Sequence, residues 1–158
     1  MSLERDVELL SQTEFFSSFN DEALRLLAFG GQRLNFKSGM ELFHEGQTSD
    51  GGFILLSGNI RIDVQISETH IKSEIEGPGS LIGELALLTR NKRVGTATII
   101  EDAEILKIRR DTLYRVLDEY PHLAANLRDK IVKSISGIGS ELERLQERYL
   151  FETEIADS

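Results

Sequence analysis

The spacing of hydrophobic residues changes twice along the chain, from a helical period near the start to a strand period in the middle and back to a helical period. In residues 15–29 apolar side chains recur every three or four positions, as in a helix with one buried face. Asn20 or Asp21 suits the N-cap position, because its side-chain oxygen can accept from an unpaired backbone N–H. We therefore expect one or two short helices in this segment.

The middle of the chain, residues 34–108, has the pattern of short strands separated by glycines. The clearest strand contains Ile60, Ile62, Val64 and Ile66, which alternate with polar residues, so we expect it to bury one face. Shorter apolar runs predict further strands at residues 53–56, 71–75, 96–100 and 104–108. About eight strands at this spacing are typical of an antiparallel sandwich or barrel.

After Arg109 the helical period returns, with a short helix over residues 111–119 and a longer one from Pro121 to about Phe151. Apolar residues of the longer helix lie four and three positions apart, at Ile131, Ile135, Ile138, Leu142, Leu145 and Tyr149. This spacing is that of a helix paired with another helix. We expect a parallel homodimer through Ile138, Leu142, Leu145 and Tyr149, the alternative being an ordinary helix face packed on the barrel.

The composition is that of one soluble folded domain, with 158 residues of which 40% are hydrophobic and 28% charged. The net charge of −9 argues against a nucleic-acid partner, which normally requires a clustered basic surface. A small anion can still bind where backbone amides and an arginine converge. Neither a signal-peptide run nor a membrane span of about 20 apolar residues is present, so we expect a cytoplasmic protein.

The residues that usually carry catalysis or bind metals do not form a group in this sequence. The chain has no cysteine, which excludes disulfides, thiolate metal sites and a thiol nucleophile. His44, His70 and His122 are far apart and lack further ligands at metal spacing. No pair of residues suggests acid–base or nucleophilic catalysis, so we expect neither an enzyme nor a metal site.

The most informative segment is residues 77–96, in which three residue types point to one kind of ligand. Gly83 is followed by a short helical turn whose first N–H groups favour an anion, and Arg93 can offer its forked guanidinium to the same anion. Glu84 would repel a phosphate unless it accepts from a donor such as a ribose hydroxyl. A ligand that carries a phosphate and an adjacent sugar hydroxyl in one rigid ring uses all three, which predicts a cyclic nucleotide.

The same segment resembles the phosphate-binding cassette of the cyclic-nucleotide-binding domain family, which includes kinase regulatory subunits, gated channels and bacterial catabolite activators. Residues 83–88, Gly-Glu-Leu-Ala-Leu-Leu, match the core of that cassette, and Arg93 follows at the family's spacing. Residues 43–50 and 53–58 resemble a second signature of the family, and the likeness extends over about residues 13–150. The resemblance implies an antiparallel double-stranded β-helix, or jelly-roll, barrel with N-terminal helices and a long C-terminal helix.

The resemblance also implies the roles of the ligand-binding residues. The implied contacts are Ile82, Gly83, Glu84, Leu85, Ala86, Arg93 and Val94. Glu84 would accept from the ribose 2′-OH, and Arg93 would pair with the exocyclic phosphate oxygens. The N–H groups of Ala86 and Val94 would donate to the same oxygens. Apolar side chains around Ile82 and Leu85 would line the pocket, and no cofactor beyond the ligand, cAMP or cGMP, is implied.

Departures from the family pattern bear on affinity and on the choice of base. Lys92 stands where the family often has proline, Ile82 replaces a common aromatic residue, and Gly95 replaces alanine or serine. Because Gly95 makes the loop less preorganised, we expect weak to moderate affinity. Relatives that prefer cGMP often carry a hydroxyl directly after the arginine, whereas this chain has Val94, which favours cAMP.

By this interpretation the chain is a sensor that couples ligand binding to movement of its C-terminal helices. Its expected divisions are an N-terminal helical segment (1–33), a β-roll (34–109) with the cassette (77–97), C-terminal helices (110–151) and an acidic tail (152–158). Two alternatives stay open. The chain could be the sensory part of a transcription regulator that lacks its DNA-binding domain, or a dimer module that keeps the fold without a ligand.

Overall fold

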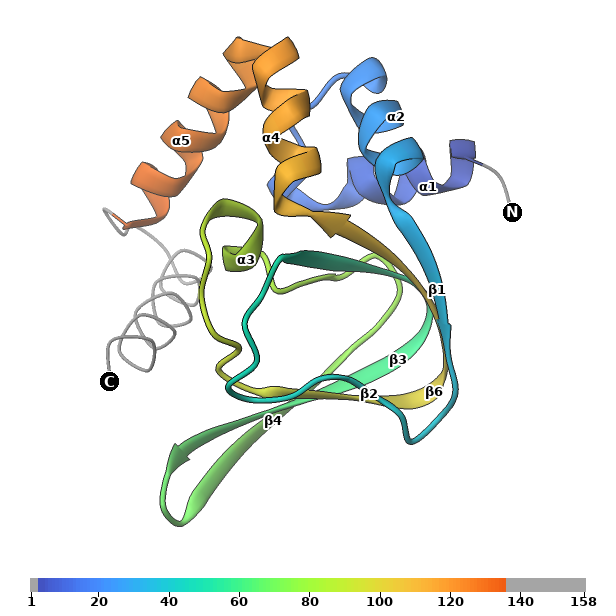
Figure 1. Ribbon diagram of the computed structural model, residues 1–158, viewed down its shortest axis with the longest axis vertical. Coiled ribbons are helices and arrows are strands. Elements are labelled where there is room, and N and C mark those ends of the chain that lie inside the picture. Colours follow the sequence, from blue (N-terminus) through green and yellow to red (C-terminus); the bar gives the residue numbers. More distant parts are fainter. Residues whose placement is uncertain (1–2, 136–158) are drawn as a thin grey trace.

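The computed structural model describes residues 3–135 as a curved β-sheet with helices at one end (Figure 1). The helices are α1 (Leu3–Gln12), η1 (Glu14–Phe16), α2 (Asp21–Gly30), α3 (Leu85–Leu88), α4 (Arg110–Glu119) and α5 (Pro121–Ile135). The strands are β1 (Gln32–Phe36), β2 (Glu41–Phe43), β3 (Gly51–Ser67), β4 (His70–Glu76), β5 (Leu81–Ile82) and β6 (Thr96–Arg109). No helix within these residues is long and apolar enough to cross a membrane.

The sheet is antiparallel throughout and is built around its two longest strands, β3 and β6. The strand order is β1-β6-β3-β4, with β2 paired to β6 and β5 paired to β3. In Figure 1 the strands curve around one another, while α1, α2, α4 and α5 lie together at one end. The predicted mainly-β fold with flanking helices is therefore confirmed.

The prediction of about eight strands is wrong, because the described residues contain six. Two pairs of expected strands are continuous: residues 53–56 and 60–66 both belong to β3, and residues 96–100 and 104–108 both belong to β6. The chain bends within β3 at Gly58, which has φ +91°. A Cβ at Gly58 would lie 2.8 Å from Ala103 Cα in β6, so glycine allows both the bend and the close approach.

Alternate residues of β3 and β6 contribute to two separate cores. In β6, Ile105 packs inside the barrel with Phe53 and Ile99, whereas its neighbour Leu106 packs among the helices with Leu24. The helical core draws on α1, α2, α4 and α5 as well as on β3 and β6. The two strands thus form a wall that both cores share.

The helices within residues 15–29 agree with the sequence pattern, and a further helix precedes them. Asn20 caps α2 by accepting a hydrogen bond from the Ala23 N–H at 2.8 Å, as predicted. The additional helix is α1, which buries Leu10 fully. The buried Asp6 of α1 forms an ion pair with Arg33 of β1, and burial raises the pKa of the Asp6 carboxyl.

The hairpin formed by β3 and β4 extends beyond the barrel (Figure 1). Ile60 is fully buried, as the alternating pattern predicts, but Ile66 is 48% exposed. The prediction that this strand buries one face along its length is therefore wrong at its far end, because no part of the barrel wall described here covers that end. The short helix at residues 111–119 and the start of the longer helix at Pro121 are confirmed. The predicted continuation of the longer helix to about Phe151 lies outside the described part of the chain, which ends at residue 135.

Candidate ligand-binding site

The cassette begins at β5, where the chain leaves the sheet and turns into α3. Ile82 of β5 pairs with Phe53 of β3 and is buried in the barrel core. Gly83 then takes φ +79°, a left-handed conformation that favours glycine, and Glu84 forms the N-cap of α3. The Ala86 N–H donates to the Gly83 carbonyl at 3.1 Å, which closes the turn. The predicted helical turn after Gly83 is thus present.

Arg93 lies against this turn and is buried to 7% exposure. Its Nη2 donates to the Gly51 carbonyl at 2.7 Å, and its guanidinium carbon lies 4.5 Å from the centre of the Phe43 ring and 5.3 Å from that of Phe53. A Cβ at Gly83 would overlap Arg93 Nη1, so a larger residue at position 83 would displace the guanidinium from its present place. Aromatic faces stabilise a guanidinium, which stays charged even when buried.

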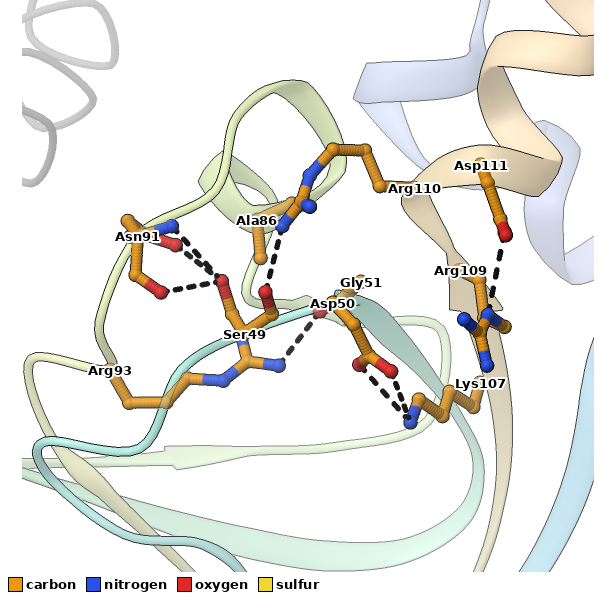
Figure 2. Close-up of polar contacts among 10 residues, drawn as sticks. All are labelled: Ser49, Asp50, Gly51, Ala86, Asn91, Arg93, Lys107, Arg109, Arg110 and Asp111. Atoms are coloured by element: carbon orange, nitrogen blue, oxygen red, sulfur yellow. Dashed lines mark hydrogen bonds and ion pairs between the residues drawn. The ribbon is translucent and has the colours of Figure 1, made fainter.

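Hydrogen bonds tie the two loops beside Arg93 together (Figure 2). The Ser49 hydroxyl donates to Asn91, to its backbone oxygen at 2.9 Å and to its side-chain Oδ1 at 2.6 Å. The Arg93 N–H donates to the Gln47 carbonyl at 2.7 Å, and the Gly46 N–H donates to the Arg93 carbonyl at 2.8 Å. The position of Arg93 is therefore set by its backbone as well as by its side chain.

A second basic group lies where β6 meets α4 (Figure 2). Arg110 donates from Nε to the Ala86 carbonyl at 2.9 Å and from Nη2 to the Ser49 carbonyl at 2.8 Å, so it connects α4 to α3 and to the loop before β3. Lys107 forms an ion pair with Asp50 at 3.1 Å. Burial disfavours the charged form of Asp50, but the hydrogen bond from Lys107 and the charges of Lys107 and Arg109 outweigh it, and the pKa of this carboxyl lies below its usual value.

These side chains border a cavity of about 660 Å³, which is within the usual size range for small-molecule sites. Two aromatic and four cationic residues line it, namely Phe43, Phe53, Arg90, Arg93, Lys107 and Arg110. Asp50 is the acidic residue on the same wall. Although the chain carries a net charge of −9, the lining of the cavity is locally positive, which is compatible with a small anion as a ligand.

Of the seven predicted contact residues, all of which the structure describes, Arg93 alone lines this cavity. Gly83 touches Arg93 from the neighbouring turn. Glu84, Leu85 and Val94 are half-buried on the cassette, and the remaining two, Ile82 and Ala86, are buried. Across the residues whose placement is described, no three histidine, aspartate or glutamate side chains gather as a metal-binding group.

Sequence reasoning missed several residues of the site, among them Asp50, Lys107 and Arg110. A signal was available for Lys107, which stands between two apolar residues in β6 and two positions after the inward-facing Ile105. A charge at an inward position of a strand is expensive unless it is paired. The partner, Asp50, is distant in sequence and could not be identified from spacing.

Known proteins are similar to this chain in sequence. The family model described as "Cyclic nucleotide-binding domain" matches residues 33–120, which is more than half of the chain. The lysophospholipase NTE1 of Chaetomium globosum is 30% identical over 140 residues, covering 84% of this chain and 9% of that protein. The cyclic AMP receptor protein of Thermus thermophilus is 27% identical over 119 residues, covering 72% of this chain and 53% of that protein.

A solved structure has the same fold. The cyclic nucleotide-binding-like protein of Brucella abortus superposes with a TM-score of 0.64 at 35% identity, covering 72% of this chain and 97% of that one. The β-roll with flanking helices is therefore the fold of the chain, as the sequence resemblance implied. The chain spans only part of the length of both curated relatives.

Proposed function

Because the chain belongs to the cyclic nucleotide-binding domain family, we propose that its cavity binds a cyclic nucleotide and prefers cAMP to cGMP. The observation that carries the proposal is the buried guanidinium of Arg93, which lies beside the Gly83 turn at the wall of a cavity of about 660 Å³. A phosphate is the partner that a planar fork of N–H donors fits best. The faces of Phe43 and Phe53 hold that fork in place.

The other cassette residues have distinct roles in this proposal. Glu84 accepts from the ribose 2′-OH, and the N–H groups of Ala86 and Val94 donate to the phosphate. Since the Ala86 N–H also donates to the Gly83 carbonyl, phosphate binding must share or replace that hydrogen bond. Ile82 and Leu85 contribute apolar surface near the ligand.

The preference for cAMP rests on Val94, which follows the phosphate-binding arginine and has no hydroxyl to offer a guanine base. The relatives support the same class of ligand, since one of them is named as a cyclic AMP receptor protein.

Arg110 is the residue through which binding would reach the C-terminal helices. It holds the Ala86 carbonyl of the cassette and the Ser49 carbonyl of the neighbouring loop, and it is the first residue of α4 (Figure 2). A shift of α3 toward a bound phosphate would therefore pull on α4, and α4 packs on α5. We propose on this basis a non-catalytic, cytoplasmic sensor whose output is a movement of α4 and α5.

Isothermal titration with cAMP and with cGMP tests the proposal, using wild-type protein and Arg93→Ala. A hydrogen bond from a charged donor contributes about 1.5–3 kcal/mol, so the variant should bind cAMP roughly ten- to 150-fold more weakly. Arg61→Ala is the matched control, because Arg61 is a partly exposed arginine that pairs with Asp63 elsewhere on the barrel. Its affinity should equal that of the wild type.

Since Arg93 also binds the Gly51 carbonyl, its replacement can lower stability, and each variant is checked by thermal unfolding. Arg93→Lys keeps the charge but not the fork, and it should fall between the wild type and the alanine variant. Folded wild-type protein that releases no heat with either nucleotide would leave a ligand-free interaction module as the function. The predicted homodimer through Ile138, Leu142, Leu145 and Tyr149 lies outside the described residues and stays a prediction.

A further inference from the structure

Strand β4 lies at the edge of the sheet, on the hairpin that extends beyond the barrel (Figure 1). It pairs with β3 through residues 70–76, and among the strands between residues 3 and 135 none pairs with its other side. An edge strand presents a row of backbone N–H and C=O groups that another strand can pair with. Pairing with a further strand is the association that this geometry offers.

The outer face of the hairpin carries two strongly exposed isoleucines. Ile71 is 60% and Ile75 is 62% exposed, and they lie opposite Gln65 and Arg61 in the β3 register. Residues two apart in a strand share a face, so Ile71, Ser73 and Ile75 form one row. This row places apolar surface at the open edge, where a partner strand would cover it.

The residues of β4 are complementary to themselves when the strand is reversed about Ser73. The strand reads His70-Ile71-Lys72-Ser73-Glu74-Ile75-Glu76. In an antiparallel pair centred on Ser73, Lys72 of each copy lies opposite Glu74 of the other, and Ile71 lies opposite Ile75. His70 lies opposite Glu76 in the same register. Opposite charges and paired β-branched side chains are the cross-strand combinations that stabilise a sheet.

Other registers lose this match. A shift by one residue sets Ile71 opposite Glu74 or Glu76, and a shift by two sets Lys72 opposite Lys72 or Glu74 opposite Glu74. Like charges directly opposite one another destabilise a pair, so the Ser73-centred register is strongly preferred. Within one chain Lys72 and Glu74 already lie 3.7 Å apart on the same face, and the paired strands would bring them into a two-by-two array of alternating charges.

We propose that two copies of this chain associate by antiparallel pairing of their β4 strands about a two-fold axis at Ser73. The contact is isologous, because the same seven residues contribute from each side. One face of the joined strands carries the Lys72 and Glu74 pairs, and the other carries a cluster of four isoleucines. Such a short contact buries little surface, so the association is weak and depends on concentration.

Site-directed cross-linking gives the most direct test, because the chain contains no cysteine. In Ser73→Cys the two thiols lie opposite each other at the axis, at a Cα separation that a disulfide can span. We expect a covalent dimer after mild oxidation of the full chain. Ser67→Cys is the control, since Ser67 lies on the same hairpin but has no partner in this register, and it should stay monomeric on a non-reducing gel.

Charge reversal tests the register independently by sedimentation over a concentration series. Lys72→Glu sets Glu opposite Glu74, and Glu74→Lys sets Lys opposite Lys72, so each variant alone should associate about tenfold or more weakly. An equimolar mixture of the two variants should associate again, as should the double variant K72E/E74K, because both restore opposite charges. Thermal unfolding checks that each variant is folded.

Cross-linking of Ser73→Cys together with rescue in the mixture supports the pairing. Equal cross-linking of both cysteine variants, or self-association that charge reversal leaves unchanged, would overturn it and assign any dimer to another surface. The cavity takes no part in this contact, so the result is independent of nucleotide binding.

Discussion

A methyl group at Gly83 tests the geometry of the site more directly than removal of any charged residue. Gly83→Ala adds one carbon at a position with φ +79°, where the new Cβ would overlap Arg93 Nη1. The guanidinium would have to move away from the turn. The change therefore displaces the predicted phosphate-binding group without altering the charge of the site.

The expected loss of stability has two parts. An L-residue in a left-handed conformation costs about 1–2 kcal/mol. Displacement of Arg93 breaks its hydrogen bond to the Gly51 carbonyl, for a further cost of about 1.5–3 kcal/mol. The variant should therefore lose about 2.5–5 kcal/mol of unfolding free energy, and its affinity for cAMP should fall roughly ten- to 150-fold, as in Arg93→Ala.

Gly79→Ala is the matched control, because Gly79 has φ +92° and a Cβ there would meet nothing within 4 Å. It should show only the backbone cost of about 1–2 kcal/mol and keep wild-type affinity. Urea unfolding followed by circular dichroism measures stability, since the chain has no tryptophan to report on unfolding. Isothermal titration measures the binding of cAMP.

The double variant Gly83→Ala/Arg93→Ala separates the backbone cost at Gly83 from the cost of displacing Arg93. In that background the methyl group has nothing to displace, so Gly83→Ala should cost no more than Gly79→Ala. Equal stability losses for the two glycine variants in the wild-type background would refute the close approach of Gly83 and Arg93. Unchanged cAMP affinity in Gly83→Ala would refute the assignment of Arg93 as the phosphate ligand.

Three further predictions concern the preference for adenine or guanine, the loss of stability at low pH, and the connection from the cassette to α4 and α5. Val94→Thr adds a hydroxyl directly after Arg93, the proposed phosphate-binding residue, and should raise the affinity for cGMP while leaving that for cAMP unchanged, as measured by titration with each nucleotide. The pKa of Asp50 lies below its ordinary value of 3.8, so the charged Asp50 stabilises the fold above pH 3.8, and this stabilisation is lost as the pH falls further. In urea unfolding, Asp50→Asn should therefore lose less stability than the wild type between pH 7 and pH 3. Arg110→Met removes the bonds to Ala86 and Ser49 and one cation from the cavity wall, so cAMP should bind more weakly. At saturating cAMP the bound nucleotide should no longer change the hydrogen exchange of α4 and α5, and an unaltered exchange response would contradict the proposed link.

Features that depend on neighbouring residues could be predicted from the sequence. Asn20 caps α2 because its side chain reaches an N–H three residues away, and the turn after Gly83 forms within a few residues. Helix periods after Arg109 were also clear. In each case the residues that determine the structure lie within one or two turns of the chain.

Features that depend on distant segments could not be predicted in the same way. The sequence pattern places Gly58 between two strands, yet it lies within one continuous strand, at a bend where Ala103 of β6 approaches closely. The Lys107–Asp50 ion pair joins residues far apart in the chain. Whether Ile66 is buried depends on where the barrel ends, and the residues near Ile66 in the sequence do not determine that.

Because β3 and β6 form a wall that both cores share, the barrel and the helices can be moved into another protein only together. Since Ile105 belongs to the barrel core and its neighbour Leu106 to the helical core, no cut along the chain separates the two cores without exposing one of them. Recombination or protein engineering would therefore transfer the cavity together with its helices. A barrel grafted alone into another protein would expose the apolar row that the helices normally cover, and it would aggregate rather than bind.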